Sequence, residues 1–195
     1  MKRGIGVLLA LALVIAMASN VGAARSKLSS ELLTSNQMPT GWSVIKPPSE
    51  SGSGLDCLAG YMKPKGALLR SHASVVFGLW GGPPVVTETL AIYSNPKTAD
   101  EKIIARLSSC KHLSGSADGV QATGTIGRQK FSKYGDASTA FSVVLNVQDS
   151  TVADFLLIVR KGDVIMALQE FDEQQYVELI PFEGFATKAL VNLPT

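Results

Sequence analysis

The sequence predicts an α+β domain: an antiparallel sheet of about six strands, with helices packed on one face and one disulfide. The expected elements run in the order helix, two strands, helix, four strands, helix, so helices do not alternate with single strands as in a doubly wound parallel sheet. The last three strands are joined by connections too short for a parallel crossover. Cys57 and Cys110 are the only cysteines, which allows a single disulfide.

The first 23 residues have the features of a cleavable secretory signal. Lys2-Arg3 gives a positive start, and the run Ile5–Ala18 then contains no charged side chain. Small residues ending at Ala23 suit a signal peptidase, and we expect cleavage there. An uncleaved membrane anchor is the alternative, but a helix of that length would reach only about 21 Å, short of the ~30 Å of a hydrocarbon core.

Removal of the signal changes what the composition implies. The whole chain has 18 Lys and Arg against 16 Asp and Glu, and losing Lys2 and Arg3 brings the net charge to zero. A net charge of zero gives no electrostatic argument for binding to nucleic acid or to an anionic membrane, and we expect no nucleic-acid partner. We therefore expect residues 24–195 to form a single extracytoplasmic domain, secreted or kept in the cell envelope, without a stable membrane span.

The two cysteines are expected to pair with each other. Thiols in an oxidising compartment most often form disulfides, and a Cys57–Cys110 bond would close a loop of about 54 residues. The chain-entropy model gives such a loop roughly 4 kcal/mol of stability. A redox-active thiol is the alternative, but the sequence has no Cys-x-x-Cys motif. Because no cysteine lies near the end of the signal, lipid attachment there is excluded.

The mature chain is expected to begin with a helix. Residues 28–36 place three leucines on one side at helical spacing. The segment Met38-Pro39-Thr40-Gly41-Trp42 ends this pattern, because proline and the residue before it disfavour the helix. Residues 43–48 are then expected to be extended.

A hairpin and a helix follow. Residues 73–80 form an apolar, β-rich run, and residues 85–94 alternate between two faces, so the pair predicts a hairpin around Gly81–Pro84. Asn95 is a suitable N-cap, and Pro96 suits the first helical position. The inner stripe of the expected helix consists of Ala99, Ile103, Leu107 and Cys110.

Four strands and a last helix are expected in the C-terminal half. The strands are predicted at 120–132, 140–147, 153–160 and 164–170, and the last three form a meander. A turn is expected at Tyr134–Ser138, with Asp136 capping local backbone groups. The final helix begins near Pro181, and its apolar face consists of Phe182, Phe185, Ala186, Ala189, Leu190 and Leu193.

Two tryptophans and a leucine are candidate contacts for a ligand or a partner. Leu79 and Trp80 precede Gly-Gly-Pro-Pro, a sequence expected at a hairpin tip or a sheet edge. If Trp80 is exposed, it can contact a ligand or partner; the commoner alternative is that it ends a core strand. Trp42 either fills the core beside the first helix or lines the rim of a cleft.

The sequence contains no recognisable catalytic, metal or cofactor site, and we expect none. His72 and His112 are the only histidines, too few for a metal site without further ligands, and His112 is expected just beyond a helix end. A G-x-S-x-G nucleophile elbow and a phosphate-binding glycine loop are both absent. The most acidic stretch consists of Glu170, Asp172, Glu173 and Glu178. Paired carboxylates could serve a glycosidase, but a solvated approach to the final helix is the simpler interpretation.

Several short motifs in a fixed order resemble a known family. They are Glu31-Leu32-Leu33-Thr34 followed by Met38-Pro39-Thr40-Gly41-Trp42, a first cysteine, a strand with Glu88 and Tyr93, the helix Ala99–Cys110, Gly135-Asp136-Ala137-Ser138-Thr139-Ala140, and Val159-Arg160-Lys161-Gly162-Asp163-Val164. Over residues 28–193 the chain resembles the extracellular sensor domain of PknH-type actinobacterial receptor kinases. LpqN-like exported lipoproteins, with a Mog1/PsbP-like α+β sandwich, are a second similar family. The resemblance implies a curved antiparallel sheet, a concave ligand-accepting face and no catalytic activity.

The resemblance and the signal together suggest a function. We expect a non-catalytic, sensor-like module that binds a small molecule, a lipid, a cell-wall fragment or an envelope protein. The chain departs from the PknH-type pattern, since that sensor domain has two disulfides and only one pair is possible here, and neither a kinase domain nor a membrane helix follows the signal. The alternatives are an exported hydrolase whose site is not recognisable from sequence, and an assembly or structural helper of the envelope.

Overall fold

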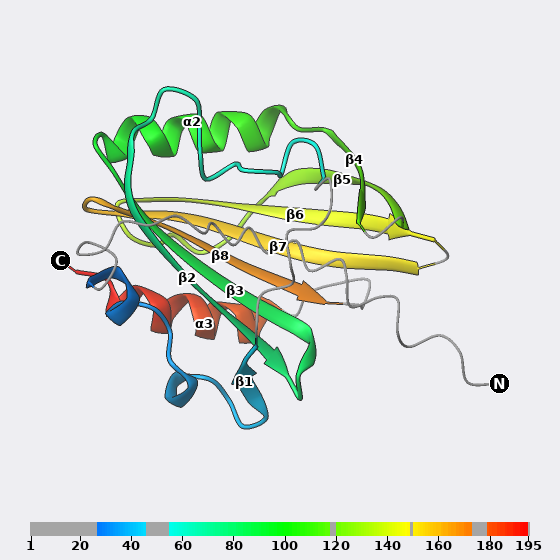
Figure 1. Cartoon of the computed structure of the whole chain (residues 1–195), viewed down its shortest axis with the longest axis horizontal. Helices are drawn as coiled ribbons and strands as arrows, with labels where there is room; N and C mark the ends of the chain where they lie inside the picture. Colours follow the sequence, from blue (N-terminus) through cyan, green and yellow to red (C-terminus); the bar gives the residue numbers. More distant parts are fainter. Residues whose placement is uncertain (1–26, 46–54, 118–119, 149, 173–178, 195) are drawn as a thin grey trace.

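A twisted antiparallel sheet forms the centre of the molecule (Figure 1). The computed structural model describes residues 27–45, 55–117, 120–148, 150–172 and 179–194, so the signal expected at residues 1–23 lies outside the described residues. The strands pair in the order β1-β2-β3-β8-β7-β6-β5-β4, always antiparallel. In chain order they are β1 (Trp42–Val44), β2 (Leu69–Leu79), β3 (Gly82–Tyr93), β4 (His112–Ala117), β5 (Val120–Gln129), β6 (Ala137–Val147), β7 (Ser150–Lys161) and β8 (Val164–Asp172).

The prediction of about six strands is wrong, because the described sheet has eight. The six expected strands correspond to β2, β3, β5, β6, β7 and β8, with shifted ends. The two additional strands are the edges of the sheet: β1 has three residues, and β4 reads His-Leu-Ser-Gly-Ser-Ala. Small and polar residues have low β propensity, and edge strands are often short, so neither strand produces a clear sequence pattern.

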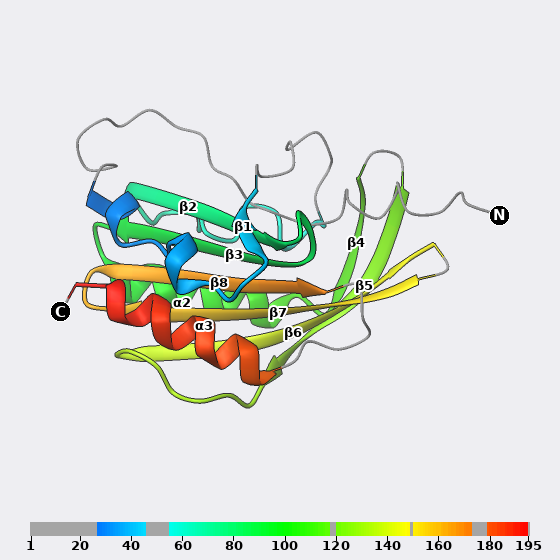
Figure 2. The same ribbon diagram turned by 90° about the horizontal axis from the view of Figure 1, so that it is seen from below.

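The prediction that helices pack on one face is also wrong. The helix α2 (Pro96–Ser109) covers one face of the sheet and α3 (Leu179–Asn192) covers the other (Figures 1 and 2). Successive residues of β7 therefore enter different cores: Leu156 and Ile158 pack with α2, and Leu157 packs with α3. All residues from 152 to 159 are buried, as in sheets covered on both sides. We call the two sides the α2 face and the α3 face.

The helix α2 begins and ends as its sequence predicts. The Asn95 side chain accepts a hydrogen bond from the Thr98 N–H at 3.0 Å, and Pro96 is the first helical residue. Cys110 is the C-cap and is buried. The expected inner stripe is confirmed, since the buried residues of the helix are Ala99, Ile103 and Leu107.

The N-terminal helix is shorter than expected. Helical structure covers residues 27–30, and a separate 3₁₀ helix, η2 (Ser35–Gln37), follows. The leucines at 28, 32 and 33 nevertheless pack on the α3 face, together with most of the apolar stripe predicted for α3. Among the described residues, no helix has the length and apolar character needed to cross a membrane.

The α2 face is concave because β4 and β5 bend toward α2 (Figure 1). Leu113 of β4 and Ile126 of β5 share the core that contains α2. Gly124 permits close packing at the bend, since a Cβ atom there would lie 2.1 Å from the Val144 carbonyl oxygen. The expected curved sheet is therefore present, and its concave side is the side that carries α2.

The disulfide Cys57–Cys110 is present. It joins the segment that precedes β2 to the C-terminal end of α2, with 6.0 Å between the two Cα atoms. The Arg106 side chain of α2 holds the same segment, because it donates hydrogen bonds to the Cys57 and Ala59 carbonyl oxygens at 3.2 and 2.7 Å. The segment is thus attached to α2 by both a covalent and a polar contact.

Candidate functional site

Polar side chains interrupt the apolar surface of the concave α2 face. They come from four adjacent strands, and strand register places them on one side of the sheet: Thr87 pairs with Gln169, Ser74 pairs with Thr89, and Asp154 pairs with Phe171, whose ring lies in the α2-side core. We call this set the polar block; it consists of Ser74, Thr87, Thr89, Asp154 and Gln169.

Thr87, Thr89 and Asp154 are buried, Ser74 and Gln169 are half-buried, and the block is partly satisfied by its own hydrogen bonds. The Gln169 amide donates to Asp154 Oδ2 at 2.5 Å. The Ser74 hydroxyl lies 2.9 Å from the Glu88 carbonyl oxygen and 3.0 Å from the Thr89 hydroxyl. Because polar groups removed from water normally find partners, a buried atom in this block that lacks one calls for a water, a proton or a ligand group to satisfy it.

Asp154 provides such an atom. Its side chain is 4% exposed, and Oδ1 has no hydrogen-bond partner. Burial raises the pKa of Asp154 to about 7, although the hydrogen bond from Gln169 opposes the shift. Burial raises the pKa of the Tyr61 hydroxyl, and the negative charge of Asp154 raises it further. Asp154 can therefore accept a hydrogen bond from a ligand when ionised and donate one when protonated.

A second buried carboxyl lies on the opposite, α3 face. Glu88 is fully buried; its Oε2 accepts a hydrogen bond from the Leu33 N–H at 2.6 Å, and Oε1 has no partner. Burial raises the pKa of Glu88 to about 7, and the Leu33 hydrogen bond opposes this. Its neighbours on this face, Leu90 and Leu168, are apolar. Glu88 thus attaches the N-terminal segment to the sheet.

Glu88→Gln is expected to remove part of a pH dependence of stability. The pKa of Glu88 is raised from 4.5 to about 7, so the folded protein keeps a proton that the unfolded chain releases in that window. The free energy of unfolding therefore falls as pH rises through the window and is level above it. Glutamine keeps an acceptor for Leu33 without the buried charge, so we expect a gain of about 2–4 kcal/mol over wild type at pH 8 and little change at pH 4.

Urea unfolding of both proteins at several pH values between these limits measures this effect. Asp154 titrates in the same range, with its pKa raised to about 7, so part of the slope should remain in the Glu88→Gln protein. If the free energy of unfolding changed with pH equally in the two proteins, Glu88 would not carry a buried, uncompensated charge.

The structure brings the predicted contact residues together. Trp80 is 81% exposed between β2 and β3, so the interpretation of Trp80 as the end of a core strand is wrong. Trp42 is half-buried, and its ring meets that of Phe185 of α3 edge-on, with centroids 5.3 Å apart. Leu79 pairs with Trp42 between β2 and β1. A ligand or partner contact at these residues stays a prediction.

The histidines and the acidic stretch lie elsewhere. His72 is half-buried in β2, whereas His112 is exposed in β4, and five strands separate the two. His112 is the first residue of a strand and lies two residues past the C-cap of α2. Glu170 and Asp172 belong to β8 and are buried, so the solvated interpretation is wrong for them. Glu173 and Glu178 lie outside the described residues.

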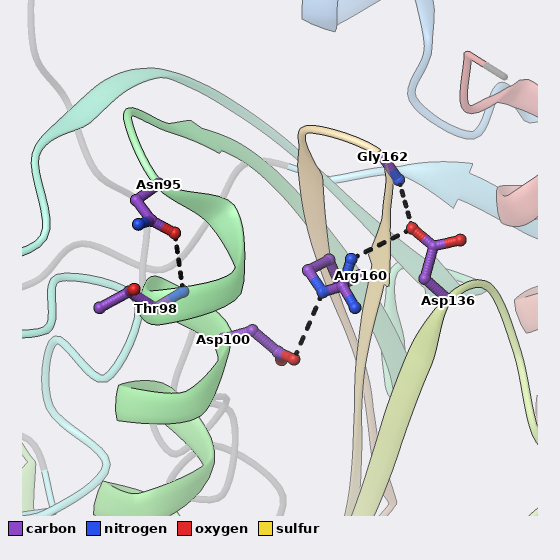
Figure 3. A network of polar contacts seen from close by, with 6 residues as sticks. All are labelled: Asn95, Thr98, Asp100, Asp136, Arg160 and Gly162. Carbon is purple, nitrogen blue, oxygen red and sulfur yellow. Dashed lines mark hydrogen bonds and ion pairs between the residues drawn. The ribbon is translucent and has the colours of Figure 1, made fainter.

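Two motifs of the family resemblance meet in one polar network (Figure 3). Asp136 Oδ2 accepts hydrogen bonds from Arg160 Nη1 at 3.2 Å and from the Gly162 N–H at 2.9 Å. Arg160 Nε lies 3.8 Å from Asp100 Oδ2 of α2. Asp136 therefore caps a backbone group 26 residues away rather than a local one. These residues fix the β7–β8 turn against α2 and the turn before β6, which is a structural role.

An open pocket of about 360 Å³ lies at the same end of the sheet, on the α3 face. Its charged lining balances, with Lys27 and Lys161 against Glu31 and Asp163. The Lys161 ammonium is already engaged, since it donates to the last carbonyl groups near the end of α3, at 3.1 and 2.8 Å. The pocket therefore shows no preference for a ligand charge.

The polar block was not predicted, although a signal for it exists. Asp154 is the one charged residue in the apolar run from 152 to 159, and Gln169 interrupts the run of β8 in the same way. Thr87 and Thr89 are correctly predicted to share one face of their strand, but their strand partners could not be known. Polar residues inside otherwise apolar, doubly buried strands would have been the indicator.

Comparison with known proteins gives a likeness in structure alone. No protein-family model matches the sequence, and no curated protein matches it. The crystal structure of the extracellular domain of PknH from Mycobacterium tuberculosis is similar, with a TM-score of 0.63 over 86% of this chain and 94% of that chain, at 10% sequence identity. The expected PknH-like fold is thus confirmed: the chain shares its fold with that extracellular domain.

Proposed function

We propose that this chain is a non-catalytic, sensor-like module of the cell envelope that binds a polar ligand at the polar block. The observation that carries the proposal is Asp154 Oδ1, a carboxylate oxygen buried in the concave face without a hydrogen-bond partner. A ligand N–H or O–H group placed there would satisfy the oxygen, and hydrogen bonds to charged groups contribute about 1.5–3 kcal/mol. Gln169 is its partner on β8, and Thr87 and Thr89 add hydroxyl groups to the same face two strands away, on β3.

An extracytoplasmic location is supported by two independent features. The Cys57–Cys110 disulfide is of a kind that forms in oxidising compartments. The shared fold is that of an extracellular domain. Together with the signal expected at residues 1–23, these features favour export to the envelope.

The absence of catalysis is proposed from the composition of the block. Its one serine, Ser74, has hydrogen-bond partners that are a carbonyl oxygen and a hydroxyl, neither of which can act as a base. Within the described ranges, no group of three or more His, Cys, Asp or Glu side chains could hold a metal ion. Asp154 can exchange a proton near neutral pH, but its hydrogen-bond partner is the Gln169 amide and not a hydroxyl nucleophile, so we propose binding without turnover.

Asp154→Asn is expected to weaken ligand retention by roughly 10–100-fold, the loss of one charged hydrogen bond. Residues 24–195 are incubated with an envelope extract, and unbound molecules are removed by desalting. Native mass spectrometry then measures the mass of ligand that stays bound to each variant. Asparagine has the same shape and removes a buried charge, so the fold should be at least as stable at pH 8.

Glu88→Gln is the matched control. It also neutralises a buried carboxyl whose pKa is raised, but on the opposite face, and should leave retention unchanged. Equal retention by wild type and Asp154→Asn would place the ligand elsewhere and refute the proposed site. Release of the ligand in a chemically altered form would refute the non-catalytic assignment.

A further inference from the structure

Trp80 is held outward at the turn between β2 and β3. Its side chain is 81% exposed, the highest value among the large apolar side chains that are exposed in the described residues. Its backbone has φ +53°, in the left-handed region that residues other than glycine rarely adopt. The two glycines that follow, Gly81 and Gly82, would occupy such a conformation at lower cost. A tryptophan here is strained and solvated, a combination typical of functional positions.

The Trp80 side chain lies against Gly41. The backbone N–H of Trp80 donates a hydrogen bond to the Gly41 carbonyl oxygen at 2.9 Å, which joins the turn to this residue. A Cβ atom on Gly41 would lie 2.9 Å from Cε2 and Cζ2 of the ring, so the ring rests against a position where only glycine leaves room. Gly41 itself has φ +93°. One edge of the indole packs on Gly41, and most of its surface remains open to solvent.

The chain around Trp80 carries no charge. Residues 38–45 and 73–87, which include β1 and the whole turn between β2 and β3, contain no Asp, Glu, Lys or Arg. The exposed polar groups of β1 and the segment before it are the hydroxyls of Thr40 and Ser43. These two stretches therefore offer a partner stacking and neutral hydrogen bonds but no ion pair.

From this geometry we infer that Trp80 is a stacking platform for a neutral sugar ring. The face of an indole is electron-rich, and the C–H bonds on one side of a pyranose ring are weakly positive, so the two surfaces attract each other. Thr40 and Ser43, one and two residues from Gly41 in the chain, are exposed and carry hydroxyls that suit those of a sugar. The inference is independent of the ligand proposed for Asp154, because it depends on neither that residue nor its face of the sheet.

The test follows the indole N–H signals of the exported protein in ¹H–¹⁵N spectra. The chain has two tryptophans, so Trp80→Phe assigns both signals. The probes are maltohexaose, cellohexaose, α-1,6-mannohexaose and chitotetraose, each titrated to about 20 mM, because a single stacking platform gives affinities near the millimolar range. We expect a saturable shift of the Trp80 signal, with the Trp42 signal unmoved, for at least one probe.

The variants distinguish stacking on the indole from binding at another part of the surface. Trp80→Ala and Trp80→Leu should each lower the affinity at least about tenfold, because neither has an aromatic face. Val191→Ala, which removes another exposed apolar side chain (78% exposed, on α3), should have no effect. Asp154→Asn should also have no effect; if it abolishes the response, the sugar binds at the polar block and the Trp80 inference fails.

Two further outcomes would overturn the inference. One is an unmoved Trp80 signal with every probe. The other is a Trp80 signal that broadens with neutral phosphatidylcholine vesicles but not with sugars, and a Trp80→Leu protein that still binds the vesicles; the turn would then contact a lipid surface. Both outcomes leave the Asp154 proposal untouched.

Discussion

Replacing Cys57 and Cys110 by alanine is expected to lower the free energy of unfolding by about 3–4 kcal/mol. The bond joins residues 53 positions apart, and a loop of this size removes many conformations from the unfolded chain. The folded state should change little, because Arg106 still holds the 57–60 segment through backbone carbonyl groups at 2.7–3.4 Å. Most of the loss therefore arises in the unfolded state.

Urea unfolding of the double variant against the oxidised wild type measures this loss. The reduced wild type is the control and should match the variant in midpoint. We also expect a larger m-value for the variant, because its unfolded chain is less compact. A difference below about 1 kcal/mol would mean that the unfolded chain is already restricted without the bond.

Gly135→Ala is expected to destabilise the fold by about 2–4 kcal/mol, the second large effect. Gly135 has φ +57°, and a Cβ atom would lie 2.5 Å from the Arg160 carbonyl oxygen and 2.9 Å from Val159 Cγ1. The same carbonyl accepts a hydrogen bond from the Asp136 N–H at 2.8 Å, so the backbone cannot move away without losing that contact.

Gly162→Ala is the matched control for this prediction. Gly162 has nearly the same backbone angle, φ +56°, but a Cβ atom there would meet nothing within 4 Å. Alanine at Gly162 should therefore lower the free energy of unfolding by only about 1 kcal/mol, the cost of a left-handed backbone conformation for a residue with a Cβ atom. Thermal or urea unfolding of both variants separates the two contributions. Equal losses would contradict a steric conflict at Gly135.

Much of the secondary structure follows from local sequence patterns. The helix α2 is predicted almost residue for residue, because the Asn95 cap, Pro96 and the apolar stripe all agree. The strands β3, β7 and β8 follow from alternation or from long apolar runs. The edges β1 and β4 escape prediction, because three residues and a serine-glycine sequence carry no periodic signal.

The arrangement of the helices could have been predicted better. A strand that faces solvent or a single layer alternates polar and apolar residues, whereas the run from Val152 to Val159 is apolar except for Asp154. Such a run requires cover on both faces. The order of elements, by contrast, does not determine the face on which each helix packs.

The candidate site depends on contacts that no local pattern contains. Asp154 and Gln169 lie 15 residues apart and meet only because β7 and β8 pair in one register. A slip of one residue would turn Asp154 to the α3 face. Trp80 is a candidate contact from the sequence alone, but its exposure depends on the left-handed turn and on Gly41, 39 positions earlier.

The strand order divides the sheet into two parts, β1–β3 and β4–β8, within which neighbouring strands are consecutive in the chain. All described strand pairings join strands that are consecutive in the chain except β3 with β8, where Ile92 meets Val164 and Val85 meets Phe171. Contacts between distant residues form slowly, because a long loop must close first. The Cys57–Cys110 loop contains β2, β3 and α2 but not β8, so the bond closes without the C-terminal strands. We expect pairing of β3 with β8 to limit the folding rate, so substitutions along this seam should slow folding more than those within either part.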